Sequence, residues 1–336
     1  MQYQRIGTSG LMVSPLCLGA MMFGDQTNEK VSAEIVASAK DAGVNFIDTA
    51  NVYSKGGSER TVGKNIHKDR DAWVVATKVG SPMGTDPLDR TNSRKRIMTE
   101  AEASLKRLQT DYIDLYYFHR DDPDTPLEEP LSAMGDLIRA GKVRYWGFSN
   151  FPAWRIAEMV AVCEAMGIPA PIATQPCYNA MNRMLEVEFL PACRHFGIGV
   201  VPYSPLARGV LTGKYPVEGP PPKGTRAGRN DVRIHESEYR YESLVLAQKI
   251  KRRAEKRGMT AGQFALNWVL NNGLISSVIA GPRTMAHWRD YLGALDHEFT
   301  AADEKFVEKL VPAGGASTPG FLDPKLPPTG REPLTQ

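Results

Sequence analysis

Short apolar runs alternate with amphipathic segments along most of the chain. After a predicted β-hairpin within residues 1–19, about eight runs of strand length are each followed by apolar residues at helical spacing. In residues 94–108, for example, Ile97, Ala101, Leu105 and Leu108 lie on one helix face. Eight β-then-α units in a chain of this length favour a closed (β/α)8 TIM barrel over a doubly wound sheet.

The same pattern predicts where the elements lie. The predicted strands span residues 16–18, 45–48, 73–77, 112–118, 143–148, 173–175, 198–203 and 277–280. The principal predicted helices span residues 31–42, 59–66, 94–108, 187–196, 243–257, 261–271 and 284–292, with a last helix after Thr300. Thr260 with Gln263, and Thr300 with Asp303, fit side-chain caps at helix starts.

The pattern breaks in two places. Residues 204–241 show no clear element and contain the Pro- and Gly-rich segment 219–228, GPPPKGTRAG; a loop of this length is typically functional or disordered. Residues 312–336 contain six prolines and four glycines. We therefore predict a single barrel domain over residues 1–311 and a disordered or extended tail over residues 312–336.

Composition narrows the possible functions. The chain of 336 residues is 42% hydrophobic and 24% charged, with a formal net charge of +3, and no basic run indicates nucleic-acid binding. No apolar leader or continuous apolar span of membrane length is present. Its four cysteines lack CxxC spacing, which is typical of buried free thiols in a reducing compartment. We expect a soluble cytoplasmic protein without nucleic-acid or membrane partners, and no apolar stripe indicates an oligomeric state.

Polar residues end three consecutive predicted strands. Asp48 ends the second strand, Lys78 the third and His119 the fourth, and Tyr53 lies in the Gly- and Ser-rich turn after Asp48. Each has an ordinary explanation, such as a turn cap for Asp48 or a solvent-seeking lysine. The carboxyl ends of barrel strands meet on one face, where active sites lie. Their coincidence there favours a catalytic set.

This set is suited to polarising a carbonyl group. An Asp48–Lys78 ion pair beneath Tyr53 is expected to lower the phenol pKa from its reference value of about 10. Tyr53 then donates and recovers a proton, while His119 orients a carbonyl oxygen or joins the proton relay. The sequence has no HExxH or clustered Cys/His spacing, no GxSxG elbow and no GxGxxG after its first strand. Reduction of a carbonyl requires a hydride as well as a proton, which implies a nicotinamide cofactor. The missing metal-ligand motifs indicate that no metal takes part.

From about Gln4 to Leu295 the sequence resembles the aldo-keto reductase superfamily, in the branch of potassium-channel beta-subunit-like and bacterial members. The resemblance rests on six ordered motifs: GVNFIDTANVYSKGGSE, VVATK, DLYYFHR, GKVRYWGFSN, YSPLARGVLTGKY and GPRTMAHWRDYLGAL. It implies a catalytic tetrad of Asp48, Tyr53, Lys78 and His119. Tyr53 is then the general acid in reduction and the general base in oxidation.

The resemblance also implies an NADPH site. Ser149, Asn150 and Gln175 resemble contacts to the nicotinamide carboxamide, and Tyr203 resembles the aromatic residue that stacks on the ring. Arg283 after the eighth strand favours NADPH over NADH by pairing with a 2′-phosphate. The remaining implied cofactor contacts come from loops after the strands: Gly19, Ala20, Met21, Asp48, Ser204, Pro205, Leu206, Ala207, Arg208, Lys214, Arg226, Gly281, His287, Asp290 and Tyr291. Here His287 and Tyr291 replace the glutamine and asparagine of many members.

The substrate class remains open. The expected substrate contacts are Met22, Phe23, Tyr53, His119 and Arg120. Arg120 indicates a polar or anionic carbonyl substrate, such as a sugar or phosphorylated aldehyde, unless it pairs with Asp121 or Asp122. We expect a reversible NADP-dependent carbonyl reductase. The alternative is a nicotinamide-binding regulatory subunit with little turnover, because YSPLARG and the Pro/Gly-rich loop resemble the channel beta-subunit branch.

Overall fold

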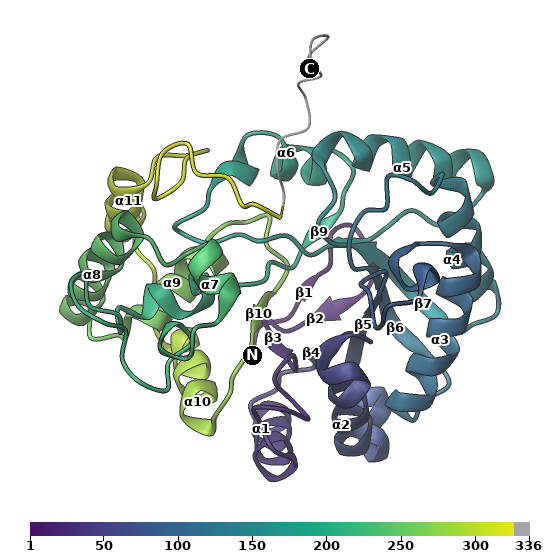
Figure 1. Cartoon of the computed structure of the whole chain (residues 1–336), viewed down its shortest axis with the longest axis horizontal. Coiled ribbons are helices and arrows are strands. Elements are labelled where there is room, and N and C mark those ends of the chain that lie inside the picture. Colours follow the sequence, from purple (N-terminus) through teal and green to yellow (C-terminus); the bar gives the residue numbers. More distant parts are fainter. Residues whose placement is uncertain (326–336) are drawn as a thin grey trace. The chain divides into compact units, whose positions relative to one another are not determined.

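The computed structural model describes residues 1–325, and its elements are shown in Figure 1. The chain forms two compact units. Unit 1 comprises Met1–Cys177, Glu188–Tyr203 and Leu270–Leu292. Unit 2 comprises Tyr178–Val187, Ser204–Val269 and the chain from Gly293 onward. All eight strands of the main sheet belong to unit 1.

The main sheet is an eight-stranded parallel barrel. Its order is β10-β3-β4-β5-β6-β7-β8-β9. The strands are β3 (Leu16–Gly19), β4 (Phe46–Asp48), β5 (Val74–Val79), β6 (Ile113–Phe118), β7 (Val143–Phe148), β8 (Ala173–Thr174), β9 (Gly199–Val200) and β10 (Val278–Ala280). Val200 pairs in parallel with Ile275, and the amide of Ile279 donates to the carbonyl of Pro202 at 3.1 Å, so β9 also bonds to the segment that carries β10. This closure confirms the predicted (β/α)8 barrel.

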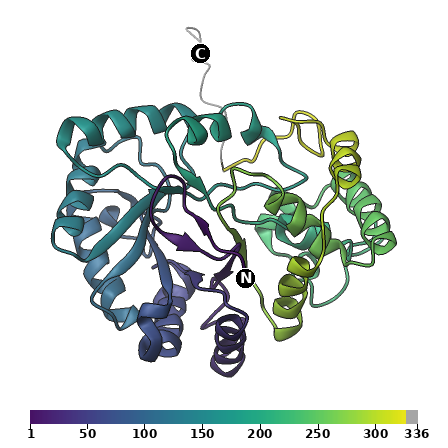
Figure 2. The same cartoon turned by 180° about the vertical axis from the view of Figure 1, so that it is seen from behind.

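An N-terminal hairpin covers one end of the barrel (Figure 2, purple). β1 (Gln4–Arg5) pairs antiparallel with β2 (Met12–Val13), and Ile6 and Val13 are fully buried in the barrel core. The amide of Thr8 donates to Gly197, just before β9, so the hairpin lies at the amino ends of the strands. Gly7, at φ +55°, is so close to Gly197 that a Cβ would lie 2.2 Å from its carbonyl oxygen. The carboxyl ends remain available for a site.

The helices of unit 1 follow the predicted periodicity. They are α1 (Glu29–Asp41), α2 (Gly57–Ile66), α3 (Arg94–Leu108), α4 (Glu128–Arg139), α5 (Ala153–Met166), α6 (Phe189–His195) and α10 (Met285–Gly293). Asn28 and Ser93 cap α1 and α3 through their side chains, and Gly167 ends α5 in the left-handed conformation. The apolar faces of these helices pack on β-branched strands such as β5, in which every residue is buried.

Unit 2 contains α7 (Val232–Glu236), α8 (Tyr241–Lys256), α9 (Ala261–Leu270) and α11 (Ala301–Leu310). The predicted caps are confirmed, because Thr260 and Gln263 bond reciprocally and Thr300 forms a capping box with Asp303. The expectation of no element in residues 204–241 is wrong for α7. Asp231 caps this helix by accepting from Ile234, but five residues are too few to show a helical period.

The described part of the tail has no helix or strand, apart from an isolated bridge between Ala316 and Asn182. It is nevertheless attached to unit 2. The amide of Ser317 donates to Met181 at 2.8 Å, and the guanidinium of Arg240 lies 3.5 Å from the ring centroid of Phe321. Residues 312–325 thus form turns and bends held against unit 2, and residues 326–336 lie outside the described chain.

Within residues 1–325, no helix combines the length and apolarity needed to cross a membrane. The same residues contain no grouping of His, Cys, Asp and Glu side chains that is arranged to hold a metal ion.

Candidate active site

The ends of β4 and β5 bring an acid and a lysine together. These strands are neighbours, and Nζ of Lys78 lies 2.5 Å from Oδ1 of Asp48. The same ammonium donates to the carbonyl of Thr49 at 2.6 Å. Lys78 is completely buried, and a buried charge requires such compensation. The predicted ion pair is therefore present.

Tyr53 begins the tight turn that follows Asp48. Its ring centroid lies 4.8 Å from Nζ of Lys78 and 5.7 Å from the ring centroid of His119, with the two rings nearly perpendicular at 87°. Ser54, Lys55 and Gly56 follow with φ of 49°, 51° and 81°. Two non-glycine residues in the left-handed region make this a strained turn. Tyr53, Lys78 and His119 thus converge as the sequence predicted.

The predicted lowering of the tyrosine pKa is wrong in its net direction. Burial raises the pKa of Tyr53 above its ordinary value, and the opposing effect of the Lys78 ammonium is the smaller of the two. Lys78 lowers the phenol pKa, as predicted. Removal of the phenol from water raises that pKa by more than one neighbouring cation lowers it. Tyr53 is therefore a neutral phenol near pH 7, which is the protonated form that a general acid needs.

His119 is held neutral. Burial, followed by the positive charges of Lys78 and Arg120, lowers the pKa of His119 to about 3. Its backbone amide donates to Val79 at 2.7 Å, which continues the β5–β6 ladder. Its buried Nδ1 atom has no hydrogen-bond partner within the described residues. Because Nδ1 is closed off, a neutral imidazole held in this way orients an oxygen atom through its other ring nitrogen, Nε2, and it does not supply a positive charge.

A second polar group adjoins these residues at the ends of β7 and β8. Gln175 donates from Nε2 to Oδ2 of Asp48 at 2.8 Å, and Ser149 donates to the carbonyl of Gln175 at 2.6 Å. The hydroxyl of Tyr203 donates to Oδ1 of Asn150 at 2.9 Å. The motif resemblance implies that these residues contact a nicotinamide, but it does not predict the bond between Gln175 and Asp48. No local signal reveals that contact, since 127 residues separate the two.

Other predicted residues of unit 1 lie at or after the ends of β3 and β10. The amide of Ala20, just after β3, donates to the carbonyl of Asp48 at 2.8 Å. Phe23 is completely buried, whereas Met21 is exposed. After β10, the carbonyl of Arg283 accepts from Thr27 at 3.1 Å. Of the remaining predicted residues of unit 1, Gly19 is the last residue of β3, Met22 and Gly281 follow β3 and β10, and three lie within α10: His287, Asp290 and Tyr291.

Arg120 follows His119 at the end of β6 and is exposed. The structure does not pair it with either neighbouring aspartate. Asp121 accepts from Arg155 at 3.2 Å, and Asp122 accepts from the amide of Asn92 at 2.7 Å. Among the described residues, no carboxylate forms an ion pair with Arg120. Its cation is therefore available beside His119.

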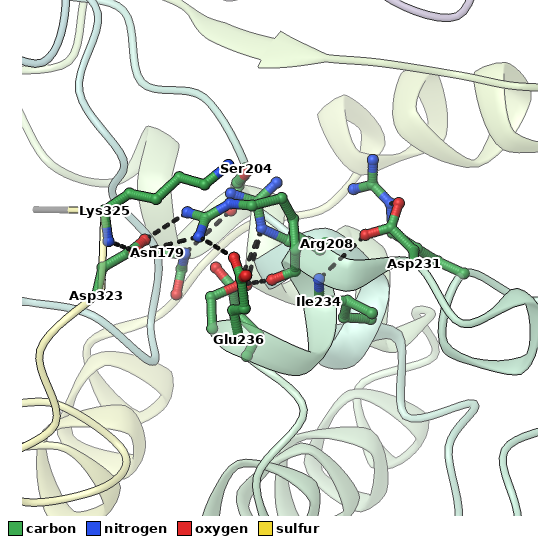
Figure 3. A network of polar contacts seen from close by, with 12 residues as sticks. Asn179, Ser204, Arg208, Asp231, Ile234, Glu236, Asp323 and Lys325 are labelled. Atoms are coloured by element: carbon green, nitrogen blue, oxygen red, sulfur yellow. Dashed lines mark hydrogen bonds and ion pairs between the residues drawn. The ribbon is translucent and has the colours of Figure 1, made fainter.

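The predicted residues Ser204, Pro205, Leu206, Ala207, Arg208, Lys214 and Arg226 belong to unit 2. Ser204, Ala207 and Arg208 have positive φ values of 55°, 47° and 53°, so this segment is also strained. Arg208 pairs with Glu238 at 2.9 Å. Figure 3 shows Arg208 within a polar network around α7 that includes Glu236 and, from the tail, Asp323.

The fold and site define a class of protein: a (β/α)8 barrel with a buried Asp–Lys pair, a neutral tyrosine and a neutral histidine at its carboxyl strand ends. Residues 15–311 match the model of the aldo/keto reductase family. The chain belongs to this family, which confirms the resemblance seen in its motifs and makes an oxidoreductase activity the general expectation.

Relatives in the family include proteins with two kinds of description. The chain is 38% identical over 303 residues to a probable voltage-gated potassium channel subunit beta of Arabidopsis thaliana, covering 88% of this chain and 92% of the relative. It is 36% identical over 331 residues to the uncharacterized oxidoreductase YrpG of Bacillus subtilis, covering 95% and 98%. A putative voltage-gated potassium channel subunit beta of Schizosaccharomyces pombe is 34% identical over 320 residues, covering 92% and 90%.

Proposed function

We propose that this protein is an NADP-dependent oxidoreductase that reversibly reduces an aldehyde or ketone to an alcohol. The observation that carries the proposal is the neutral Tyr53 phenol, which lies beside the Lys78 ammonium and nearly perpendicular to the ring of a neutral His119. A proton donor and a neutral imidazole ring thus lie side by side, which suits the protonation of a carbonyl oxygen held between them.

The residues around the tetrad fit a nicotinamide. Ser149, Asn150 and Gln175 offer hydroxyl and amide groups at adjacent strand ends, and Tyr203 offers an aromatic ring bonded to Asn150. These groups would hold the carboxamide and the flat face of the ring. When bound, the nicotinamide supplies the hydride. We assign Arg283 to the 2′-phosphate, which favours NADP. Ser204–Arg208 and Lys214 are proposed to contact the pyrophosphate, and Arg226 is proposed as an arginine that lies over the cofactor.

In reduction, Tyr53 donates its phenolic proton to the carbonyl oxygen while His119 orients that oxygen. The phenolate that remains on Tyr53 is stabilised by the ammonium of Lys78 at close range. Asp48, together with the Thr49 carbonyl, holds Lys78 in its charged form and in position. In oxidation, the same phenolate accepts the proton of the alcohol. The attraction between the Lys78 ammonium and Tyr53 is therefore stronger after the proton has left than before. Catalysis requires such an interaction, which strengthens on the way to the transition state.

We propose that the substrate meets Met22 and Arg120 around this centre; Phe23, also predicted as a contact, is completely buried and offers it no surface. Arg120 is exposed beside His119, and both neighbouring aspartates bond elsewhere, which supports a carbonyl substrate bearing an anionic or sugar-like group. None of the four cysteines, Cys17, Cys163, Cys177 and Cys193, forms a disulfide in the described chain, which suits a reducing compartment, so the cytoplasm is the proposed location.

The test is Tyr53→Phe, which removes only the hydroxyl. Loss of a general acid is expected to lower kcat by about 10²-fold or more. NADPH affinity, measured by fluorescence titration, is expected to remain unchanged. Near wild-type carbonyl reduction by the variant would contradict the proposed mechanism.

A second candidate is a nicotinamide-binding regulatory subunit with little turnover. It is favoured by the similarity to relatives described as potassium channel beta subunits. Stoichiometric NADPH oxidation across aromatic aldehydes, sugars and ketones, with NADH as a control, separates the two. Tight NADPH binding without turnover on any of these substrates would favour the regulatory role.

A further inference from the structure

A buried ionic network lies behind the Tyr53 turn and is built from the outer helices. Arg107, in the last turn of α3, donates from Nε to Oε2 of Glu59 at 2.5 Å and from Nη2 to Oε2 of Glu100 at 3.3 Å. The Glu59 side chain is completely buried, and that of Arg107 is 15% exposed. Within the described residues, Arg107 is the only cation in ion-pair contact with Glu59. The arginine thus compensates a fully buried carboxylate.

Each glutamate of this network holds a neighbour of the tetrad. Oε1 of Glu59 accepts from the hydroxyl of Thr77 at 2.6 Å, and Thr77 directly precedes Lys78 on β5. Oε2 of Glu100 accepts from Nδ2 of Asn51 at 2.8 Å. Asn51 stands two residues before Tyr53, and its backbone amide donates to the carbonyl of Lys78 at 3.3 Å. One guanidinium therefore connects the strand that carries Lys78 with the loop that carries Tyr53.

Arg107 also packs directly beneath the Tyr53 turn. A Cβ atom on Gly56 would lie 2.7 Å from Cδ of Arg107 and 3.1 Å from its Nε. Gly56 closes the three-residue left-handed segment that begins with Ser54 and Lys55. Such a conformation persists only where the surroundings determine it. The stem of Arg107 is one of those surroundings.

We infer that Arg107 is a positioning residue, which sets Tyr53 against Lys78 through Glu59, Glu100 and the backbone of Gly56. Among the described residues, no hydrogen bond, ion pair or ring contact joins Arg107 to Tyr53 or to Lys78, so it acts through these intermediates. The inference rests on the proposed function only in taking Tyr53 as the proton donor.

A second buried pair in the same unit provides a matched control. Nη2 of Arg70 lies 2.6 Å from Oδ2 of Asp114, and these side chains are 10% and 15% exposed. Asp114 also accepts from the amide of Val75, so this pair joins β5 and β6 near their amino ends. It has the same chemistry as the Arg107–Glu59 pair but lies at the opposite end of the strands from the tetrad.

The experiment compares Glu59→Gln/Arg107→Met with Arg70→Met/Asp114→Asn. Each double variant removes both charges, so neither leaves a buried charge unpaired. We expect Glu59→Gln/Arg107→Met to lower kcat by about 10- to 100-fold with unchanged NADPH affinity, since small misplacements of reacting groups have effects of this size. The control variant Arg70→Met/Asp114→Asn is expected to keep the wild-type kcat, even if its melting temperature falls by as much as that of Glu59→Gln/Arg107→Met. If the first variant fails to fold, Arg107→Lys replaces it. Lysine keeps the positive charge but cannot bond to Glu59 and Glu100 at once as the guanidinium does, so we expect kcat to fall in the same way.

A readout that needs no turnover is the ¹³Cζ resonance of Tyr53 in tyrosine-labelled protein, identified by its absence in Tyr53→Phe. The resonance is expected to shift or broaden in Glu59→Gln/Arg107→Met and to stay unchanged in the control. Equal losses of kcat in both double variants, or an undisturbed Tyr53 resonance with wild-type kcat, would overturn the inference. If the wild type reduces no carbonyl, the proposed function fails, while the resonance still decides the role of Arg107.

Discussion

Lys78 and Asp48 end neighbouring parallel strands and form an ion pair of 2.5 Å in which neither side chain is more than 4% exposed. Burial alone lowers the pKa of Lys78, but its hydrogen-bonded partners, foremost the carboxylate of Asp48, raise it further than burial lowers it. The ammonium is therefore charged in the folded protein because of its partners. Loss of either partner is therefore expected to affect both the stability of the fold and the charge that lies beside Tyr53.

Removing one partner is predicted to destabilise the fold. Asp48→Asn leaves the Lys78 ammonium buried without its counter-charge, and the free energy of unfolding should fall by about 3–5 kcal/mol. Asp48→Asn/Lys78→Met removes both charges and should be more stable than Asp48→Asn alone. Urea unfolding at pH 7 measures both. A double variant no more stable than the single one would contradict the argument.

His119 is predicted to make stability depend on pH. Its folded pKa of about 3 lies below the unfolded value of about 6.5, so between these values the unfolded state binds more protons. The contribution is complete above pH 6.5 and is lost as the pH falls toward 3, at up to about 1.4 kcal/mol per pH unit. His119→Asn should flatten the pH dependence between pH 6 and 5. Chemical unfolding of both proteins at those values checks it; parallel slopes would oppose it.

The sequence was sufficient to predict the barrel and the convergence of the tetrad. A buried parallel strand is a short apolar run, and the polar residue that ends it, such as Asp48, Lys78 or His119, must lie on the carboxyl face. The motif resemblance added the family. The strand-end residues and the motifs are local in sequence, and the barrel follows from the repeated β-then-α unit, so one sequence is enough to predict them.

The remaining features depend on distances through space. The pKa of Tyr53 rises because its loop excludes water, and no spacing in the sequence measures that exclusion. Gln175 meets Asp48 across 127 residues, and Arg107 meets Glu59 across 48. From the sequence alone, each of these polar side chains could equally be exposed to solvent. The five residues of α7 lack a visible period for a different reason, which is their number.

Arg120 is predicted to select anionic carbonyl substrates. Arg120→Gln should reduce kcat/KM for 4-carboxybenzaldehyde by about tenfold or more relative to 4-nitrobenzaldehyde, because a hydrogen bond to a charged group contributes about 1.5–3 kcal/mol. Arg144→Gln, which removes an equally exposed charge from β7 near its amino end, serves as the control. An equal loss for both aldehydes in Arg120→Gln would oppose a role in selectivity.

The described tail is predicted to stabilise unit 2. Phe321 stacks under Arg240, and its replacement by alanine should lower the free energy of unfolding by about 1–2 kcal/mol. Leu322→Ala changes a neighbour that is 44% exposed and should have little effect. Thermal unfolding and limited proteolysis of the full chain compare the two. If both variants match the wild type, Phe321 adds no measurable stability.

Gly56 is predicted to report directly on the packing of Arg107. Gly56 and Gly167 both have positive φ, at 81° and 62°, so alanine at either position incurs a similar backbone penalty of about 1–2 kcal/mol. At Gly167 a Cβ meets nothing within 4 Å, whereas at Gly56 it lies 2.7 Å from Cδ of Arg107. Gly56→Ala should therefore be the more destabilising of the two, and it alone should lower kcat.

A double-mutant cycle separates the contact from the backbone effect. In an Arg107→Ala background the clash is removed, so Gly56→Ala should then be no more destabilising than Gly167→Ala. The coupling energy between positions 56 and 107 is expected to be about 0.5–3 kcal/mol, the range for residues in contact. Urea unfolding of the four proteins in the cycle measures it. Additive effects would mean that Gly56 is required by its own φ alone, and that the stem of Arg107 does not shape the turn that presents Tyr53.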